Sequence, residues 1–179
     1  MLYLSANYPS FFNRQGIFKI DDGFIANRHI TYEVSIRARA FQHRCGGIIL
    51  DEKTILTAAQ CCMLPNQCYV VSAGLIEEQS YPKQSAQIDK FIHHPNFTMI
   101  YNDYGENYAV NDYLILKLKQ ALRFDWNVQP VCLPSTFYQP KIGKVCVMSG
   151  YGKESWSMFI LICKNIILID YLISSIIFQ

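Results

Sequence analysis

The sequence contains no run of basic residues and no Cys-x-x-Cys motif. Sixteen Lys and Arg against 14 Asp and Glu give a formal net charge of +2, and without a concentrated positive patch nucleic acid is not an expected partner. Its seven cysteines lack the paired spacing of a zinc site, so we expect no metal and no cofactor. They favour an oxidised, disulfide-bonded chain instead. Because seven is odd, at least one thiol is left over.

No secretory signal peptide is visible at the N-terminus. Residues 1–8 have neither a basic start nor an apolar run of signal-peptide length. The cysteines nevertheless predict a secreted or extracellular protein. Either the true start is missing from the sequence or the product stays inside the cell.

Internal repeats, low-complexity linkers and a long helical period are all absent up to residue 155. Short alternating or apolar runs, separated by turn residues, recur along this part of the chain instead. Many short strands of this kind predict an all-β sandwich or barrel. At 179 residues the chain is long enough for one small barrel and part of another. We expect strands at 31–38, 47–50, 53–56, 68–75, 85–92 and 113–118.

Glycine and proline are missing from residues 156–179, which carry almost no charge. This apolar tail has about the ~20 residues that a membrane helix needs. Lys164 and Asp170 oppose that interpretation, at roughly +2.5 to +3.5 kcal/mol each near the bilayer centre. The composition also matches translated A/T-rich non-coding DNA. We therefore favour a truncation or artefact for the tail, and a membrane is not an expected partner.

Several ordered motifs resemble one family. Residues 57–61 read Thr-Ala-Ala-Gln-Cys and follow His-Arg-Cys-Gly-Gly at 43–47. Residues 111–118, 128–134 and 150–152 read Asn-Asp-Tyr-Leu-Ile-Leu-Lys-Leu, Val-Gln-Pro-Val-Cys-Leu-Pro and Gly-Tyr-Gly. In this order and spacing they resemble the chymotrypsin/trypsin-like serine proteases (peptidase family S1). Residues 47–52 also resemble mite trypsins, a lineage that contains inactivated paralogues.

The resemblance implies an all-β, chymotrypsin-like double β-barrel fold. We expect a complete N-terminal barrel at 20–134, after a propeptide-like segment at 1–19. An interdomain connection and the first strand of a truncated C-terminal barrel would follow at 135–155, and a non-homologous hydrophobic tail at 156–179. In such a chain the strand at 145–149 would lack pairing partners and expose an edge.

The same resemblance implies a degenerate catalytic site. Gln60 stands where the family has the histidine that takes the serine's proton, and an amide does not titrate near neutral pH. Asp112 matches the aspartate of the triad, and the two Gln60 amide N–H groups can satisfy it. The nucleophile segment Gly-Asp-Ser-Gly-Gly-Pro does not occur in the sequence, nor does a Gly-x-Ser-x-Gly elbow. His43 matches a structural strand position, for which a local hydrogen bond is expected.

Other family positions concern processing and disulfides. Lys19 and Ile20 resemble the activation cleavage site. Cys45 and Cys61 match the disulfide that holds the histidine loop. Cys62 and Cys68 can close a second, local bridge, although the adjacency of Cys61 and Cys62 leaves the pairing open. Cys132, Cys146 and Cys163 are left without expected partners.

One glycosylation sequon, Asn96-Phe97-Thr98, lies in an expected surface turn and has meaning only in a secreted chain.

The sequence is compatible with three interpretations of what the protein is and does. The first is a non-catalytic serine protease homologue that binds protease substrates, inhibitors or cofactors without cleaving them. The second is a truncated gene prediction of a secreted trypsin-like endopeptidase, with the residues after Ser155 read from an intron. The third is a membrane-tethered β-domain that uses the tail as its anchor.

Overall fold

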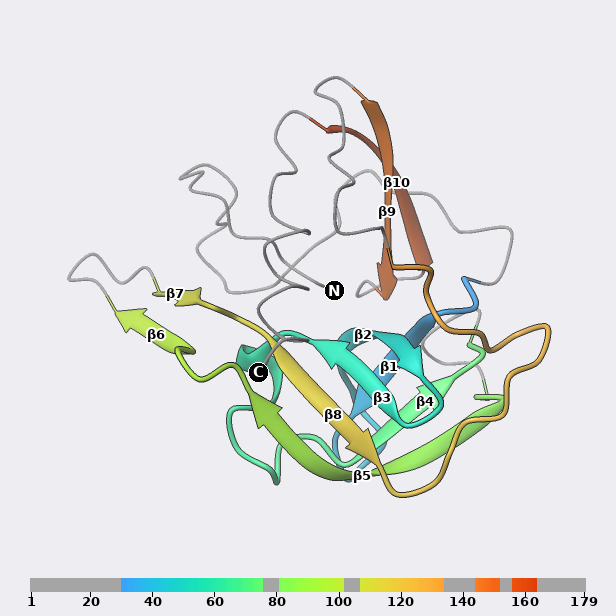
Figure 1. The fold of residues 1–179 in the computed structure, drawn as a ribbon, viewed down its shortest axis with the longest axis horizontal. Helices are drawn as coiled ribbons and strands as arrows, with labels where there is room; N and C mark the ends of the chain where they lie inside the picture. The colour runs from blue at the N-terminus through green and yellow to red at the C-terminus, as the bar shows by residue number, and fades with distance from the viewer. Residues whose placement is uncertain (1–29, 76–80, 102–106, 134–143, 152–155, 164–179) are drawn as a thin grey trace.

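A closed six-stranded barrel forms the centre of the computed structural model (Figure 1). The structure describes residues 30–75, 81–101, 107–133, 144–151 and 156–163. Every neighbouring pair of barrel strands is antiparallel, in the order β1-β2-β3-β8-β5-β4, and β4 returns to pair with β1. The barrel strands are β1 (Glu33–Arg37), β2 (His43–Asp51), β3 (Thr54–Thr57), β4 (Val70–Ala73), β5 (Gln84–His93) and β8 (Leu114–Leu118).

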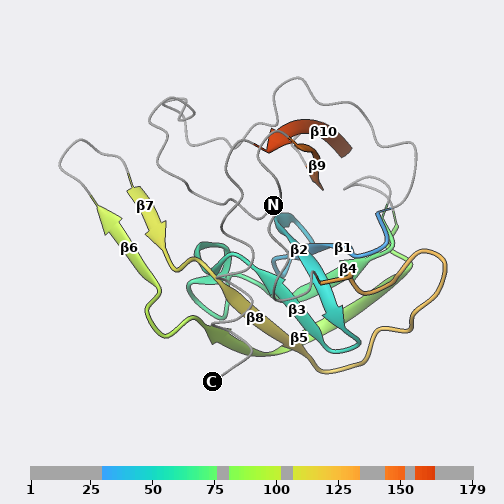
Figure 2. The ribbon, with the colours of Figure 1, turned by 45° about the horizontal axis from the view of Figure 1, so that its top comes forward.

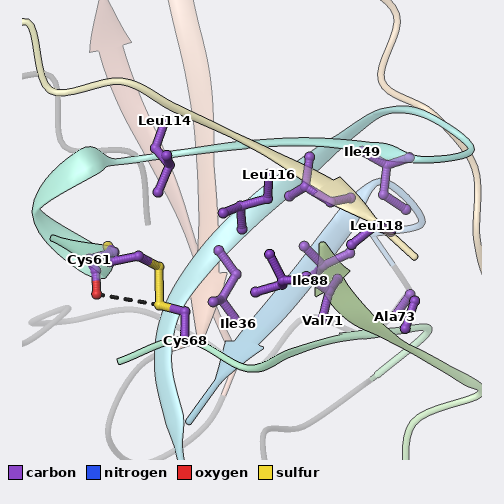
Figure 3. Packing of buried hydrophobic residues seen from close by; sticks show 14 of the residues in the cluster. Ile36, Ile49, Cys61, Cys68, Val71, Ala73, Ile88, Leu114, Leu116 and Leu118 are labelled. Carbon is purple, nitrogen blue, oxygen red and sulfur yellow. Dashed lines mark hydrogen bonds between the residues drawn. A yellow bond between two sulfur atoms is a disulfide. The ribbon is translucent and has the colours of Figure 1, made fainter. Parts of the chain in front are cut away.

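These strands confirm the expected fold class and the six predicted runs, because each run contains or overlaps one barrel strand. Most of their inward side chains are valine, isoleucine or leucine, and Ala73 and Ala86 fill narrower positions; β-branched side chains suit a pleated and buried surface. Figure 3 shows the core from close by. The fully buried side chains there include Ile36, Ile49, Val71, Leu114 and Leu116.

Gly47 allows β2 to approach its neighbours closely. A Cβ atom at this position would lie 3.0 Å from Cγ2 of Ile55 and 3.1 Å from Cδ1 of Ile36. Both atoms belong to core side chains with no exposed surface. A larger residue would therefore push the core apart.

Two further strands, not predicted, form a hairpin between β5 and β8. β6 (Thr98–Tyr101) pairs with β7 (Asn107–Val110) in a separate two-stranded sheet. Figure 2 shows this hairpin extending away from the barrel at the end of β5. Its exposed aromatic side chains are Tyr101 and Tyr108.

The expectation of an unpaired strand at 145–149 is wrong. β9 (Lys144–Tyr151) pairs along its whole length with β10 (Trp156–Cys163), from Tyr151 opposite Trp156 to Lys144 opposite Cys163. The first part of the apolar tail thus supplies hydrogen bonds to an edge that would otherwise be open. Among the residues that the structure describes, no helix has the length and apolar character needed to span a bilayer.

Candidate functional site

The site lies where the ends of β3 and β8 meet. Thr57 pairs with Leu114 at the last position of the β3–β8 ladder. The residues that follow Thr57 therefore face those that precede Leu114. The first group forms a short 3-10 helix, η1 (Ala59–Cys62), which contains Gln60. The second group contains Asp112, so strand register alone brings Gln60 and Asp112 together.

Asp112 accepts hydrogen bonds from the start of η1. The Gln60 backbone N–H donates to Asp112 Oδ1 at 2.8 Å. Hydrogen bonding from the Gln60 side chain and from the Ala59 backbone N–H also acts on the pKa of this carboxyl group. Burial raises the pKa of Asp112, and these hydrogen bonds oppose the rise. Gln60 and Asp112 are therefore in direct contact, through the backbone N–H of Gln60.

The backbone before Asp112 is held in an unusual conformation. Asn111 has φ of 52°, a left-handed value that asparagine tolerates better than most residues. Its Nδ2 donates to the Asn96 carbonyl oxygen at 2.9 Å, and the Tyr113 N–H donates to the Asn111 carbonyl at 2.8 Å. Asn111 therefore aims Asp112 at η1 and also connects the site to the turn at Asn96.

Two disulfides fix η1 on the barrel. Cys45 of β2 is bonded to Cys61, with Cα atoms 6.1 Å apart, and Cys62 is bonded to Cys68, with Cα atoms 5.6 Å apart. The expected Cys45–Cys61 pairing is confirmed, and the pairing that the sequence left open is Cys62–Cys68. The two residues after Gln60, Cys61 and Cys62, are thus bonded to two different parts of the chain.

Side chains from two strands, β2 and β5, add hydrogen bonds to η1, and a third side chain joins the end of β3 to β2. Arg44 Nε donates to the Cys61 carbonyl oxygen at 2.6 Å, and His93 Nε2 lies 3.2 Å from the Cys62 carbonyl oxygen, to which it can donate. The buried Thr57 hydroxyl donates to the Gly46 carbonyl oxygen at 2.8 Å. No pattern in the sequence pointed to Arg44 or His93 as supports of this loop, because each contact spans distant residues.

His43 belongs to a second polar cluster, on the side of the barrel that faces β9. Its Nδ1 lies 2.8 Å from Ser35 Oγ, and Arg37 Nε donates to the same oxygen at 3.1 Å. Ser35 accepts from Arg37 and can therefore donate its own hydroxyl proton to an unprotonated Nδ1. Burial, with the positive charge of Arg37, lowers the pKa of His43 to about 4. The expected structural role of His43 is confirmed.

Glu33 connects this cluster to β9. The Ser149 hydroxyl of β9 donates to Glu33 Oε1, and the Tyr151 ring lies 5.4 Å from the His43 ring. Glu33 is only 7% exposed, and its Oε2 has no hydrogen-bond partner among the described residues. Burial raises the pKa of Glu33. No local pattern predicts this contact, because Glu33 and Ser149 are 116 residues apart.

The other residues that the sequence analysis named either lie on the surface or fall outside the residues that the structure describes. Asn96 is exposed in a turn. Cys132 is a free, exposed cysteine. Lys19 and Ile20 lie outside the described residues. Within the described ranges, no group of three or more His, Cys, Asp or Glu residues is placed to hold a metal ion.

Comparison of the sequence with protein families and with individual proteins finds serine proteases in both cases. The Trypsin family model matches residues 20–162, so the match continues seven residues beyond the composition change at Ser155. Mouse kallikrein 1-related peptidase b11 is 30% identical over 119 residues, which cover 64% of this chain and 44% of that protein. Human transmembrane protease serine 5 is 32% identical over 120 residues, covering 64% of this chain and 25% of that protein.

A solved structure shows the same fold. Neuropsin, a serine protease expressed in the limbic system of mouse brain, superposes with a TM-score of 0.61 at 24% identity. The superposition covers 78% of this chain and 62% of neuropsin. The chain spans less than half the length of the mouse kallikrein relative that it matches.

Proposed function

The chain belongs to the trypsin family of serine proteases, and from that premise we propose that it is a non-catalytic member that acts by binding other proteins. The observation that carries the proposal is Gln60, which occupies the position of the family's catalytic histidine in the Thr-Ala-Ala-His-Cys motif. A general base in this chemistry must accept the serine's proton and return it to the leaving amine. A carboxamide has no site that does so near neutral pH.

The fit between Gln60 and Asp112 supports a retained scaffold. A partly buried carboxylate without donors would be costly. The Gln60 backbone N–H donates to Asp112 whatever the side chain at position 60, and the Gln60 side-chain amide also lowers the pKa of this carboxyl group, so loss of the base leaves the carboxylate with a donor. Gln60 thus keeps the local architecture of the site while ending its proton transfer.

The expected partners are proteins: protease substrates, inhibitors or cofactors. They would be bound by the trypsin-like scaffold and would dissociate uncleaved. The two disulfides support a secreted or extracellular location. We propose that residues 20–134 form one folding unit, with the β9–β10 sheet packed against it through Ser149 and Glu33.

A binding experiment tests this function. The immobilised, disulfide-bonded chain should retain one or more members of a panel of protein inhibitors and protein substrates of trypsin-like enzymes. Mass spectrometry of the eluted partner should show an intact polypeptide. The matched control is the reduced and alkylated chain, in which the two disulfides no longer hold η1. Release of cleaved partner, or equal retention by the alkylated control, would contradict the proposal.

A second candidate is a secreted trypsin-like endopeptidase, of which these 179 residues are one part. The observation that favours it is coverage, because the matched kallikrein-related peptidase extends well beyond the aligned region. Sequencing of full-length transcripts across the Ser155 codon separates the two candidates. A continuation that encodes Gly-Asp-Ser-Gly-Gly-Pro would favour the endopeptidase, although Gln60 would still be present in it.

A further inference from the structure

We infer that Asn96 is an N-glycosylation site and that its glycan stands beside the Gln60–Asp112 pair, at the base of the β6–β7 hairpin. Asn96-Phe97-Thr98 is the only Asn-x-Ser/Thr sequon in the 179 residues. Such a sequence is modified only where the asparagine is accessible on the surface of a secreted protein. The inference therefore rests on the proposed passage of the chain through the secretory pathway.

The turn presents Asn96 outward. Asn96 and Thr98 are both exposed, whereas Phe97 between them is partly buried against the core. The Phe97 N–H donates to the His94 carbonyl oxygen at 2.9 Å and closes the turn. A turn anchored by its middle side chain leaves the acceptor and the hydroxyl residue of the sequon on the solvent side.

Hydrogen bonds occupy the backbone of Asn96 but leave its side chain available. The Asn96 N–H donates to His94 Nδ1 at 3.2 Å, and the Asn96 carbonyl oxygen accepts from Asn111 Nδ2 at 2.9 Å. The Asn96 carboxamide itself makes no hydrogen bond with the described residues. Its nitrogen can therefore be glycosylated without breaking any contact that holds the turn.

The reaction is transfer from a lipid-linked oligosaccharide pyrophosphate. The Asn96 side-chain nitrogen forms a bond to the anomeric carbon of the sugar and loses one proton. The bond between that carbon and the pyrophosphate oxygen breaks, and the lipid pyrophosphate leaves with the electron pair. No oxidant or reductant takes part.

The position gives the glycan two neighbours. The Asn111 side chain connects the Asn96 turn to the residue immediately before Asp112. On the other side, β6 begins at Thr98 and carries Tyr101, which is 68% exposed and belongs to a hairpin with a second exposed tyrosine, Tyr108. A bulky, hydrated glycan there would shield the exposed tyrosines of the hairpin and limit approach to the Gln60–Asp112 pair from that side.

The test uses the full chain, directed to the endoplasmic reticulum of an insect cell by an added leader. The recovered protein is treated with peptide N-glycosidase in water enriched in oxygen-18. Mass spectrometry should show Asn96 converted to heavy-labelled Asp in most molecules. Thr98→Val, which keeps the side-chain shape but removes the hydroxyl, should abolish the label, and Thr98→Ser should keep it. The glycosylated chain should also bind less of an apolar-surface dye than the Thr98→Val chain.

The same sample is mapped for the Cys45–Cys61 disulfide, which reports oxidation in that compartment independently of the sugar. A bridged chain with Asn96 labelled supports the inference. A bridged chain with Asn96 unmodified overturns the site and leaves the secretory proposal intact. Failure to form the bridge overturns the secretory proposal, and the glycosylation inference falls with it.

Discussion

The Gln60 backbone N–H and Asp112 Oδ1 are 2.8 Å apart and join two segments that are 52 residues apart in the chain. The bond does not depend on the side chain at position 60, because its donor is a main-chain amide. Asp112 therefore has a structural role in capping η1 that is separate from any proton transfer.

Loss of the whole Asp112 carboxyl group, in Asp112→Ala, should destabilise the chain more than loss of its charge alone, in Asp112→Asn. Asp112→Ala leaves the amides of Ala59 and Gln60 without their acceptor, which costs ~1–3 kcal/mol of unfolding free energy. Asp112→Asn keeps an acceptor oxygen and should cost less than the alanine variant. Urea denaturation of the two variants measures the difference. Equal stabilities would show that the cap does not support η1.

The two disulfides should contribute unequally to the free energy of unfolding. Cys45 and Cys61 are 16 residues apart and Cys62 and Cys68 are 6 apart. Loop-closure entropy then gives roughly 3 kcal/mol for the longer loop and roughly 2 kcal/mol for the shorter. The measurement compares Cys45→Ala/Cys61→Ala with Cys62→Ala/Cys68→Ala by thermal and urea unfolding. A larger loss from the shorter loop would contradict the entropic account.

Acid should destabilise the chain through His43. Its pKa is about 4 in the folded chain and about 6.5 in an unfolded chain. The unfolded state therefore binds more protons between these values, and stability falls as the pH is lowered from about 6.5 to about 4. The loss approaches ~3 kcal/mol when the pH is below both values. In the His43→Asn variant, the free energy of unfolding should change less between about pH 6.5 and about pH 4.

Glu33 should act in the opposite direction. Burial raises its folded-state pKa, so the stability associated with the protonated acid is fully present below the unfolded value of about 4.3 and is lost as the pH rises through the folded value. Glu33→Gln keeps an acceptor for the Ser149 hydroxyl. The variant should be more stable than the native chain at pH 7, and its advantage should shrink at pH 4. Equal stability at both pH values would show that Glu33 is solvated.

Barrel strands were the most predictable part of the fold. Runs such as 113–118 and 85–92 alternate or stay apolar because one or both faces are buried, so their pattern reports their environment. The β6–β7 hairpin was missed because its side chains are largely exposed or only partly buried. Burial imposes no pattern on such strands.

Contacts between distant residues were less predictable. Only the family resemblance predicts that Gln60 and Asp112 lie together, and no local pattern in the sequence does so. The β9–β10 pairing was missed because an uninterrupted apolar segment fits a membrane helix, a buried strand or non-coding sequence equally well. Glu33 and Ser149 are ordinary residues in their own segments, and only the packing of β9 on the barrel gives them a joint role.

The most direct test of the central claim is peptide-bond hydrolysis by the purified chain and by its Gln60→His variant, each after cleavage at Lys19. The assay combines turnover of a chromogenic arginine or lysine amide with labelling by a serine-directed phosphonate. We expect neither turnover nor labelling in either protein, because the variant regains a base but these 179 residues contain no Gly-Asp-Ser-Gly-Gly-Pro segment. Saturable turnover or serine-specific labelling by the unmodified chain, with contaminating proteases removed, would contradict it.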